Sequence, residues 1–462
     1  MKKIKGKKNL LLYGCSGMGV NLLTLIVGSY LCNALRIEEL ENVLGTHTYL
    51  GYSLVFAGLW MVLKTLAKAL DGFIDLPFAF FTDRIKSKFG RRKTGLLLGY
   101  IPMVIFFICF LFPLTKSESL ANTIWFGVIL CLFYSFYTLT MLTYYATFSE
   151  VCETEQDTVF LSNVKSVCDV VYFILGFVVF PIFMNMGINV RFVALIFLPL
   201  SLTMMIPMFM LKENVKDENS DDESFVDDHT ASRVTIKEAF KCSFANKEFI
   251  YWMFTEAVLA IGLQLFLGST SVLFEVAGLN QTLIMAFAFA PVPLTIIVYN
   301  KLVKEKGLGF SFRYILLMFA GGMVLLAFVI FFKEHLTTGL LYAIAIVAAL
   351  MVSQSIGSFF SINYTVPTYL AQKEHEKSGK DVATMYFAIQ GIFEGVAAGI
   401  ATGVILEALR NYNHAEFIPI VIIVACLGAF TMSFFLTKNI NQMGKKNKNE
   451  ESVDTIEVEA IE

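Results

Sequence analysis

The chain has 462 residues, of which 56% are hydrophobic and 16% are charged, and its mean hydropathy is +0.66. Soluble domains average about 25% charged residues, so these few charges cannot cover the water-facing surface of a soluble protein of this length. The formal net charge of −2 is uninformative by itself, and no nucleic-acid partner is implied. The composition therefore excludes a soluble globular protein and predicts a partner in the lipid bilayer.

Residue patterns for catalysis or metal binding are absent from the sequence. The eight cysteines are scattered with no CxxC spacing, and the five histidines lie far apart. This pattern indicates neither a metal site nor a disulfide framework. No GxSxG, HExxH or P-loop motif occurs. We therefore expect no catalytic residues, no metal, no cofactor and no enzyme activity.

The apolar residues come in runs of about 20, the length that crosses the hydrocarbon core. The basic start of the chain leads into an apolar run without a small-residue cleavage site, so we interpret that run as a spanning helix and not as a signal peptide. The first six predicted spans are 10–34, 48–82, 95–114, 121–150, 159–187 and 190–211, and the second six are 248–274, 280–302, 311–332, 337–366, 381–408 and 415–437.

Polar segments divide the twelve spans into two sets. We expect an N-terminal six-helix bundle over 1–211, a linker over 212–247, a C-terminal six-helix bundle over 248–437 and a polar tail over 438–462. Two six-helix sets fit transporters whose halves rock around a site at the middle of the membrane. The predicted fold is therefore an all-α membrane protein of the major facilitator type, and we expect a monomer.

Basic residues alternate between the gaps that separate the spans. The N-terminus, the gaps after spans two, eight and ten, and the tail each carry several lysines or arginines. The opposite gaps hold single basic residues, which are Arg36, Lys116, Arg191, Lys333 and Arg410. By the positive-inside rule, this pattern predicts that the linker, the tail and both termini are cytoplasmic in a multi-pass protein of the plasma membrane.

The second span carries four charged residues, Lys64, Lys68, Asp71 and Asp75. Their spacing places them within an arc of about 60° on one helix face. A charge at the bilayer centre costs about 2.5–3.5 kcal/mol on insertion scales, so these charges must pair or face water. Two interpretations remain open. The stripe is either a structural ladder of ion pairs, or a cation or proton site facing a central cavity with the lysines as charge partners.

Other polar side chains in the spans are candidates for lining a substrate cavity: Asn21, Tyr145, Lys165, Glu256, Gln390 and Glu394. Lys165 lies four residues before Asp169, a spacing that predicts an ion pair. Glu256 and Glu394 have no basic partner in their own helices, so each is either protonated or awaiting a ligand. Such amides more often form helix–helix hydrogen bonds than ligand contacts, and Tyr145 is equally typical of plain packing.

Three segments resemble one transporter family. The sequence DGFIDLPFAFFTDRIKSKFGRRKTGLLLGYIP from Asp71 to Pro102, together with YGCSGMGVN and YYATFSEVCETEQDTVFLSNVKSV, is similar to motifs of the glycoside–pentoside–hexuronide cation symporters, the melibiose-carrier family. The resemblance is clear in the N-terminal half and weak in the C-terminal half. It implies that Asp71 and Asp75 bind the coupling cation and that Asn21 takes the position of a sugar-contacting residue.

The same resemblance implies a cytoplasmic gate between spans two and three. Its residues in this sequence are Asp83, Arg84, Gly90, Arg91 and Arg92, with Glu150 in the loop after span four. The expected function is symport of a sugar, glycoside or similar small solute, coupled to sodium or protons. Open alternatives are a proton-coupled or uncoupled carrier of another solute, including lysolipid, and a membrane sensor that does not transport.

Overall fold

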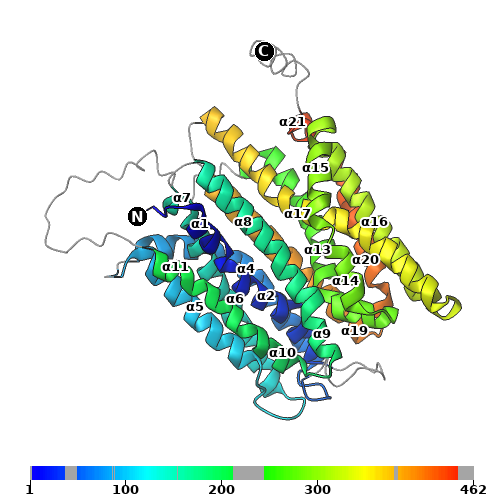
Figure 1. Ribbon diagram of the computed structural model, residues 1–462. Coiled ribbons are helices and arrows are strands. Elements are labelled where there is room, and N and C mark those ends of the chain that lie inside the picture. Colours follow the sequence, from blue (N-terminus) through cyan, green and yellow to red (C-terminus); the bar gives the residue numbers. More distant parts are fainter. Residues whose placement is uncertain are drawn as a thin grey trace, which may run out of the picture.

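The computed structural model describes residues 3–36, 49–85, 87, 89–152, 155–211, 244–378 and 383–445, and within these ranges the elements are helices without strands (Figure 1). Eleven helices in the described part are long and apolar enough to cross a membrane. The helix α4 (Ala57–Arg84) is also 28 residues long, but its charged residues separate it from those eleven. Together they correspond to the twelve predicted spans.

The helices up to residue 211 follow the first six predicted spans. They are α1 (Lys7–Gly14), a 3-10 turn (Cys15–Gly17), α2 (Met18–Ile26), a π-helical turn (Val27–Leu31), α3 (Cys32–Ala34), α4, α5 (Arg91–Phe110), α6 (Leu120–Ala146), α7 (Phe148–Val151), α8 (Glu155–Ile174), a π-helical turn (Leu175–Val179), α9 (Phe180–Asn185), α10 (Val190–Phe197), a 3-10 segment (Leu198–Met204) and α11 (Met205–Met210). We call residues 3–211 the N-terminal half.

The helices from residue 247 onward follow the second six. They are α13 (Lys247–Ala277), α14 (Gln281–Phe289), α15 (Val292–Lys306), α16 (Leu308–Phe332), a 3-10 turn (Lys333–His335), α17 (Thr338–Ser378), α18 (Ala383–Gly399), a π-helical turn (Ile400–Ile405), α19 (Leu406–Asn411), a 3-10 turn (Ala415–Phe417), α20 (Ile418–Ser433) and α21 (Lys438–Gln442). We call residues 244–445 the C-terminal half. The predicted linker over 212–247 lies almost wholly outside the described residues.

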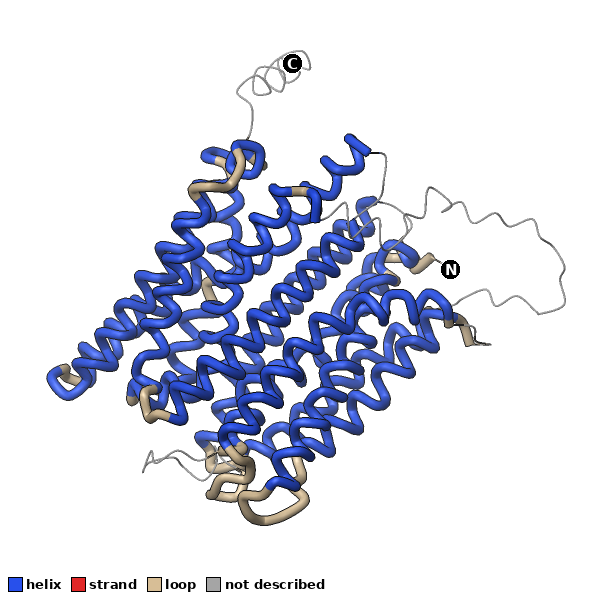
Figure 2. Tube along the Cα trace, turned by 180° about the vertical axis from the view of Figure 1, so that it is seen from behind, coloured by secondary structure: helices blue, strands red, loops and turns tan. Residues whose placement is uncertain are grey.

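The long helices run side by side, with their connecting turns at the two ends of the molecule (Figure 2). The start of α1 and the helix α21 lie at the same end (Figure 1). We call this end the N-terminal face and the other end the opposite face. Local signals fix several helix ends: the Asn246 side chain caps α13 by accepting from Phe249 N at 3.2 Å, and Gly278 ends that helix with φ of 67°.

Two spans differ from their predicted lengths. The second helix begins at Ala57 and not near 48, because residues 49–56 form an irregular segment whose backbone bonds the end of the first helix, with Leu54 N donating to Leu35 O at 2.9 Å. The tenth helix, α17, continues to Ser378 and not to 366. The apolar run ends before the helix does, since a polar sequence can continue a helix beyond the bilayer.

The two halves meet most closely where α4 packs on α18. A Cβ atom built on Gly72 would lie 2.3 Å from the backbone oxygen of Gly391, and one on Gly395 would lie 2.8 Å from Gly72 Cα. Only residues without a side chain allow two backbones to approach this closely. We call this contact the glycine seam. It sets the distance between the halves beside Asp71, which precedes Gly72 in the chain.

Candidate functional site

The Asp71 carboxylate on α4 has two polar partners, a hydroxyl and an ammonium group. The Thr138 hydroxyl on α6 donates to Asp71 Oδ1 at 2.6 Å, and the Lys68 ammonium lies 3.7 Å from Asp71 Oδ2. Lys68 Nζ also lies over the ring of Tyr134, 3.8 Å from its centroid. We call Lys68, Asp71, Tyr134 and Thr138 the Asp71 cluster. A carboxylate and a hydroxyl oxygen are hard ligands that suit a small cation.

The Asp71 cluster leaves Lys68 with two partners. Its ammonium contacts a carboxylate on one side and an aromatic ring on the other. A cation that took Asp71 would therefore leave Lys68 with its cation–π contact. Asp75 lies on the same helix one turn further on, but its side chain falls outside the described part of the structure.

A second polar cluster lies beside the first, across helices α2, α6 and α8. Asn21 Oδ1 accepts a hydrogen bond from the Tyr137 hydroxyl at 3.1 Å, and the predicted pair of Lys165 with Asp169 is confirmed at 2.5 Å. Lys165 Nζ also lies 5.4 Å from the centroid of the Tyr145 ring. We call these five residues the Asn21 cluster. Donors, acceptors and half-buried aromatic rings together are the groups that bind a polar ring.

The two clusters are joined on α6. Tyr137 bonds Asn21, while the next residue, Thr138, bonds Asp71. Tyr144 on the same helix serves the fold: its hydroxyl is buried and donates to the backbone oxygen of Tyr13 at 2.5 Å. The sequence did not identify Thr138 as a partner of Asp71 or Tyr137 as a partner of Asn21, because a spanning helix rich in aromatic and hydroxyl residues does not show which of them face α4 or α2.

Glu256, Gln390 and Glu394 form a third group, in the C-terminal half. Glu256 on α13 is 1% exposed, and neither of its carboxyl oxygens has a hydrogen-bond partner among the described residues. The carboxyl of Glu394 on α18 faces it, and Gln390 Nε2 donates to Glu394 Oε1 at 2.7 Å. The structure therefore brings all three together, although the sequence treated them as separate cavity residues. We call them the Glu394 cluster.

A charged cluster joins the two halves toward the opposite face. Lys64 Nζ on α4 lies 2.9 Å from Glu407 Oε1 on α19, and Arg36 Nη1 lies 2.8 Å from Glu407 Oε2. Arg410 Nη1, one turn from Glu407, lies 3.6 Å from Oε1. These four side chains are all less than a tenth exposed. Removing one partner from such a pair would leave an uncompensated buried charge.

Asn33, near the end of the first helix, completes this cluster. Its Oδ1 accepts from Lys64 Nζ at 3.3 Å and from Arg410 Nη1 at 3.4 Å. Its Nδ2 donates to the backbone oxygen of Gly268 on α13 at 2.8 Å. We call Asn33, Arg36, Lys64, Glu407 and Arg410 the Glu407 cluster. It ties the first two helices of one half to two helices of the other.

The Glu407 cluster corrects two expectations from the sequence. The helical spacing allows Lys64 to pair within its own helix, but its observed ion-pair partner is Glu407 on α19. Arg36 and Arg410 were counted as loop charges, but both are buried against Glu407. The sequence holds Glu407 and Arg410 three residues apart near the end of one span and Arg36 near the end of another, but it does not show that they meet.

The predicted gate is described only in part. Gly90 is buried with φ of 97°, a conformation that favours glycine, and its N–H donates to Ser87 O at 3.1 Å in the turn that begins α5. Arg92 is 8% exposed and Arg91 is half-buried. The side chains of Asp83, Arg84 and Glu150 lie outside the described part of the structure.

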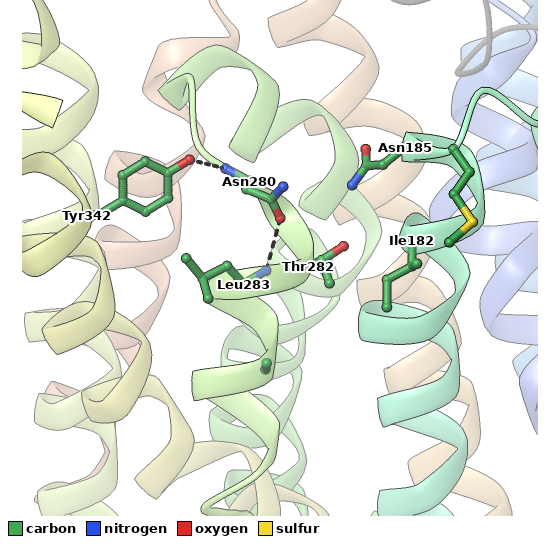
Figure 3. Close-up of a pocket in the computed structure, with 8 residues that line it drawn as sticks. Ile182, Asn185, Asn280, Thr282, Leu283 and Tyr342 are labelled. Carbon is green, nitrogen blue, oxygen red and sulfur yellow. Dashed lines mark hydrogen bonds between the residues drawn. The ribbon is translucent and has the colours of Figure 1, made fainter. Parts of the chain in front are cut away.

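A surface groove also lies between the halves, on the opposite face. It has a volume of about 620 Å³ and is lined by Ile182, Asn185, Met186, Asn280, Thr282, Leu283, Ala286 and Tyr342 (Figure 3). The Asn280 backbone N–H donates to the Tyr342 hydroxyl at 3.0 Å, and Asn280 Oδ1 accepts from Leu283 N at 3.1 Å. These bonds cap α14, so the polar groups of Asn280 serve the fold.

Comparisons with known proteins place the fold. A family model described as "MFS/sugar transport protein" matches residues 12–415. The structure is similar to that of the nucleoside transporter NupG, with a TM-score of 0.62, 14% identity, and coverage of 93% of this chain and 98% of that one. No curated protein matches the chain significantly.

Two further solved structures have the same fold. A bacterial homologue of the human lysosomal transporter Spinster, in an inward-facing and unoccupied conformation, gives a TM-score of 0.56 at 13% identity, over 96% of this chain and 98% of that one. A POT family transporter in complex with 5-aminolevulinic acid gives 0.59 at 14% identity, over 94% and 97%. At these identities, the likeness concerns the arrangement of the helices.

Proposed function

We propose cation-coupled symport of a sugar, glycoside or similar small solute. The chain belongs to the MFS/sugar transport protein family and is therefore a secondary transporter of the major facilitator type. The proposed location is the plasma membrane, with the N-terminal face in the cytoplasm. The family is one of transporters and not of enzymes.

The observation that carries the proposal is the Asp71 cluster beside the Asn21 cluster. Asp71 receives the Thr138 hydroxyl at 2.6 Å and faces the Lys68 ammonium at 3.7 Å. In the proposed cycle, sodium or a proton binds Asp71 with Asp75 and displaces Lys68, which keeps its contact with the ring of Tyr134. The ion thereby replaces an internal charge, so its binding need not leave a buried charge without a partner.

The solute is proposed to bind at the Asn21 cluster. Asn21 and Tyr137 offer an amide and a hydroxyl, the pair of Lys165 and Asp169 offers charged donors and acceptors, and Tyr145 offers a ring face. Hydroxyl-rich solutes need many donors and acceptors at short range, and aromatic rings stack on the apolar face of a sugar ring. Because Tyr137 and Thr138 are consecutive, ion binding and solute binding act on the same turn of α6.

The Glu407 cluster is proposed to close the opposite face. Its residues come from the first, second and eleventh spans, and its bonds cross between the halves. Opening this face would require Lys64 and Arg36 to separate from Glu407. Alternating access would then exchange these ion pairs for solvent, at a cost that solute and ion binding must offset.

The test is uptake into right-side-out membrane vesicles. A panel of labelled glycosides and sugars is offered under sodium, lithium or proton gradients, with wild type, Asp71→Asn and the surface variant Glu305→Gln as matched control. Glu305 lies on α15 in an exposed pair with Lys301. We expect saturable, gradient-driven uptake that Asp71→Asn abolishes and Glu305→Gln preserves. Saturable binding without flux would indicate a sensor, and gradient-independent flux an uncoupled carrier; either result would overturn the proposal.

A further inference from the structure

We propose that Glu256 and Glu394 share one proton and form a proton-binding site in the C-terminal half, distinct from the Asp71 cluster. The two residues come from different helices, α13 and α18, which pack against one another, and their carboxyl groups interact. The inference rests on the proposed transport function only for its consequence in the cycle.

The Glu256 side chain is buried inside the protein. This residue is 1% exposed, and both carboxyl oxygens lack a hydrogen-bond partner among the described residues. By the helix rise of 1.5 Å per residue, it lies about 14 Å along α13 from Lys247, well inside the span. A buried carboxylate without donors is costly, so the unpartnered side chain indicates a small ligand that supplies a donor. The smallest such ligand is a proton.

Glu394 is the proposed acceptor of the shared proton. This side chain is only half-buried, and the Gln390 amide donates to its Oε1 at 2.7 Å. In the proposed pair, protonated Glu256 donates its O–H to the Glu394 carboxylate. Two ionised carboxylates in contact would repel one another in a medium of low dielectric, and one shared proton removes that repulsion.

The other charged groups described on the helices packed around Glu256 contact other residues. The helix α20 has no charged residue between Ile418 and Ser433. Arg313 on α16 contacts the backbone oxygen of Ser433, and Lys373 on α17 pairs with Glu248 near the start of α13. Beyond α18, the charges of α4 and α19 lie in the Asp71 and Glu407 clusters. Among these described groups, Glu394 is the one that acts on Glu256.

Glu394 lies beside the contact between the two halves, so gain or loss of this proton can affect how the halves move. Gly391 and Gly395 flank Glu394 in the chain and form the glycine seam with Gly72, next to Asp71. Glu394 is the more exposed of the two acids, so we infer that the proton enters and leaves through it. Loss of the proton to water leaves two negative charges between α13 and α18, which favours their separation.

The test reads protonation directly and needs no substrate. The purified protein in lipid nanodiscs is examined by infrared spectroscopy at neutral pH, where the C=O stretch of a protonated carboxyl group is resolved from ionised carboxylates. We expect a band in wild type that disappears in Glu256→Gln. The matched control, Glu248→Gln, removes a carboxyl from the same helix that is paired with Lys373, and should keep the band.

A second variant keeps the test decisive if Glu256→Gln does not fold. In Glu394→Gln, the acceptor of the shared proton changes from a charged to a neutral group, so the band should shift in frequency. An unchanged spectrum in both variants, or no band in wild type, would overturn the proposal. The spectrum is measured without transport. The shared-proton proposal can therefore fail while Asp71-dependent uptake is still observed, and Asp71→Asn can abolish uptake while the infrared band persists.

Discussion

The Lys64 ammonium on α4 lies 2.9 Å from the Glu407 carboxylate on α19, although 343 residues separate them in the chain. This pair crosses between the halves and is buried on both sides. Since each residue sits on a different half, the distance between them is set by the relative position of the halves. The pair therefore reports whether the opposite face is closed.

Neutralising one member of this pair should destabilise the closed arrangement. Glu407→Gln leaves Lys64, Arg36 and Arg410 around a neutral amide, and breaking a buried ion pair costs about 3–5 kcal/mol. We expect a lower melting temperature and faster labelling, from the opposite face, of a cysteine placed at Ser271, whose hydroxyl donates to Ser29 O at 3.2 Å. In a double-mutant cycle, Lys64→Met combined with Glu407→Gln should cost less than the sum of the two single changes, and strictly additive losses would contradict the pairing.

The hydroxyl of Thr138 should contribute to ion affinity. Thr138→Val keeps the shape of the side chain but removes the donor to Asp71. A hydrogen bond to a charged group contributes about 1.5–3 kcal/mol, so with sodium as the ion the concentration for half-maximal uptake should rise about tenfold or more, since a ligand oxygen is lost as well. With a proton as the ion it should fall, because loss of the donor favours the protonated carboxyl group. Thr143→Val is the control, because that hydroxyl donates to the Leu139 backbone oxygen in its own helix. Equal effects of the two variants would assign Thr138 a packing role.

The double variant Lys68→Met with Asp71→Asn separates the two interpretations of the charged stripe. Asp71→Asn alone leaves Lys68 with its ring contact but without its carboxylate, so folding and coupling should both suffer. The double variant should restore protein yield in membranes without restoring gradient-driven uptake. Full recovery of uptake would show that the pair of Lys68 and Asp71 is only structural.

The glycine seam should not tolerate a methyl group. In Gly72→Ala the new Cβ would lie 2.3 Å from the Gly391 oxygen, whereas Gly58→Ala in the same helix meets nothing within 4 Å. Overpacking costs about 1–3 kcal/mol and sometimes more, while alanine in an open helical position is favourable. We expect the melting temperature to fall in Gly72→Ala and to hold or rise in Gly58→Ala. Similar melting temperatures would mean that the two backbones are not in contact.

The orientation in the membrane can be tested with single cysteines in a cysteine-free variant. Phe89, at the N-terminal face, is 71% exposed, and Tyr412, at the opposite face, is 76% exposed. The positive-inside pattern predicts a cytoplasmic N-terminal face. An impermeant thiol reagent added outside intact cells should therefore label Tyr412→Cys and spare Phe89→Cys. The reverse pattern would invert the topology.

The sequence predicts those features that depend on neighbours along one helix. Span positions follow from runs of apolar residues, and the pair of Lys165 with Asp169 follows from a spacing of four. The partner of Lys64 could not be derived in this way, because helical spacing shows which residues share a face but not which distant helix covers that face. The fit of Glu407 between Lys64 and Arg36 depends on how the halves pack.

The same limit applies to Thr138 and to Glu256. A threonine in an aromatic-rich helix carries no sign that it faces Asp71 on α4. The isolation of Glu256 from basic residues was visible in the sequence, but its contact with Glu394 was not, since the two are 138 positions apart and their meeting requires α13 and α18 to be adjacent. Tertiary packing, and not local preference, decides each of these contacts.

The glycine seam has a mechanical consequence. Side chains that interlock must be disengaged before two surfaces can slide, but Gly72, Gly391 and Gly395 present bare main chain to each other. Two such helix surfaces can rotate against one another with little change in contact energy. The seam would then be the pivot that holds the halves at a fixed separation. The free energy that decides which side opens would come from the charges of the Asp71 and Glu407 clusters and not from these glycines.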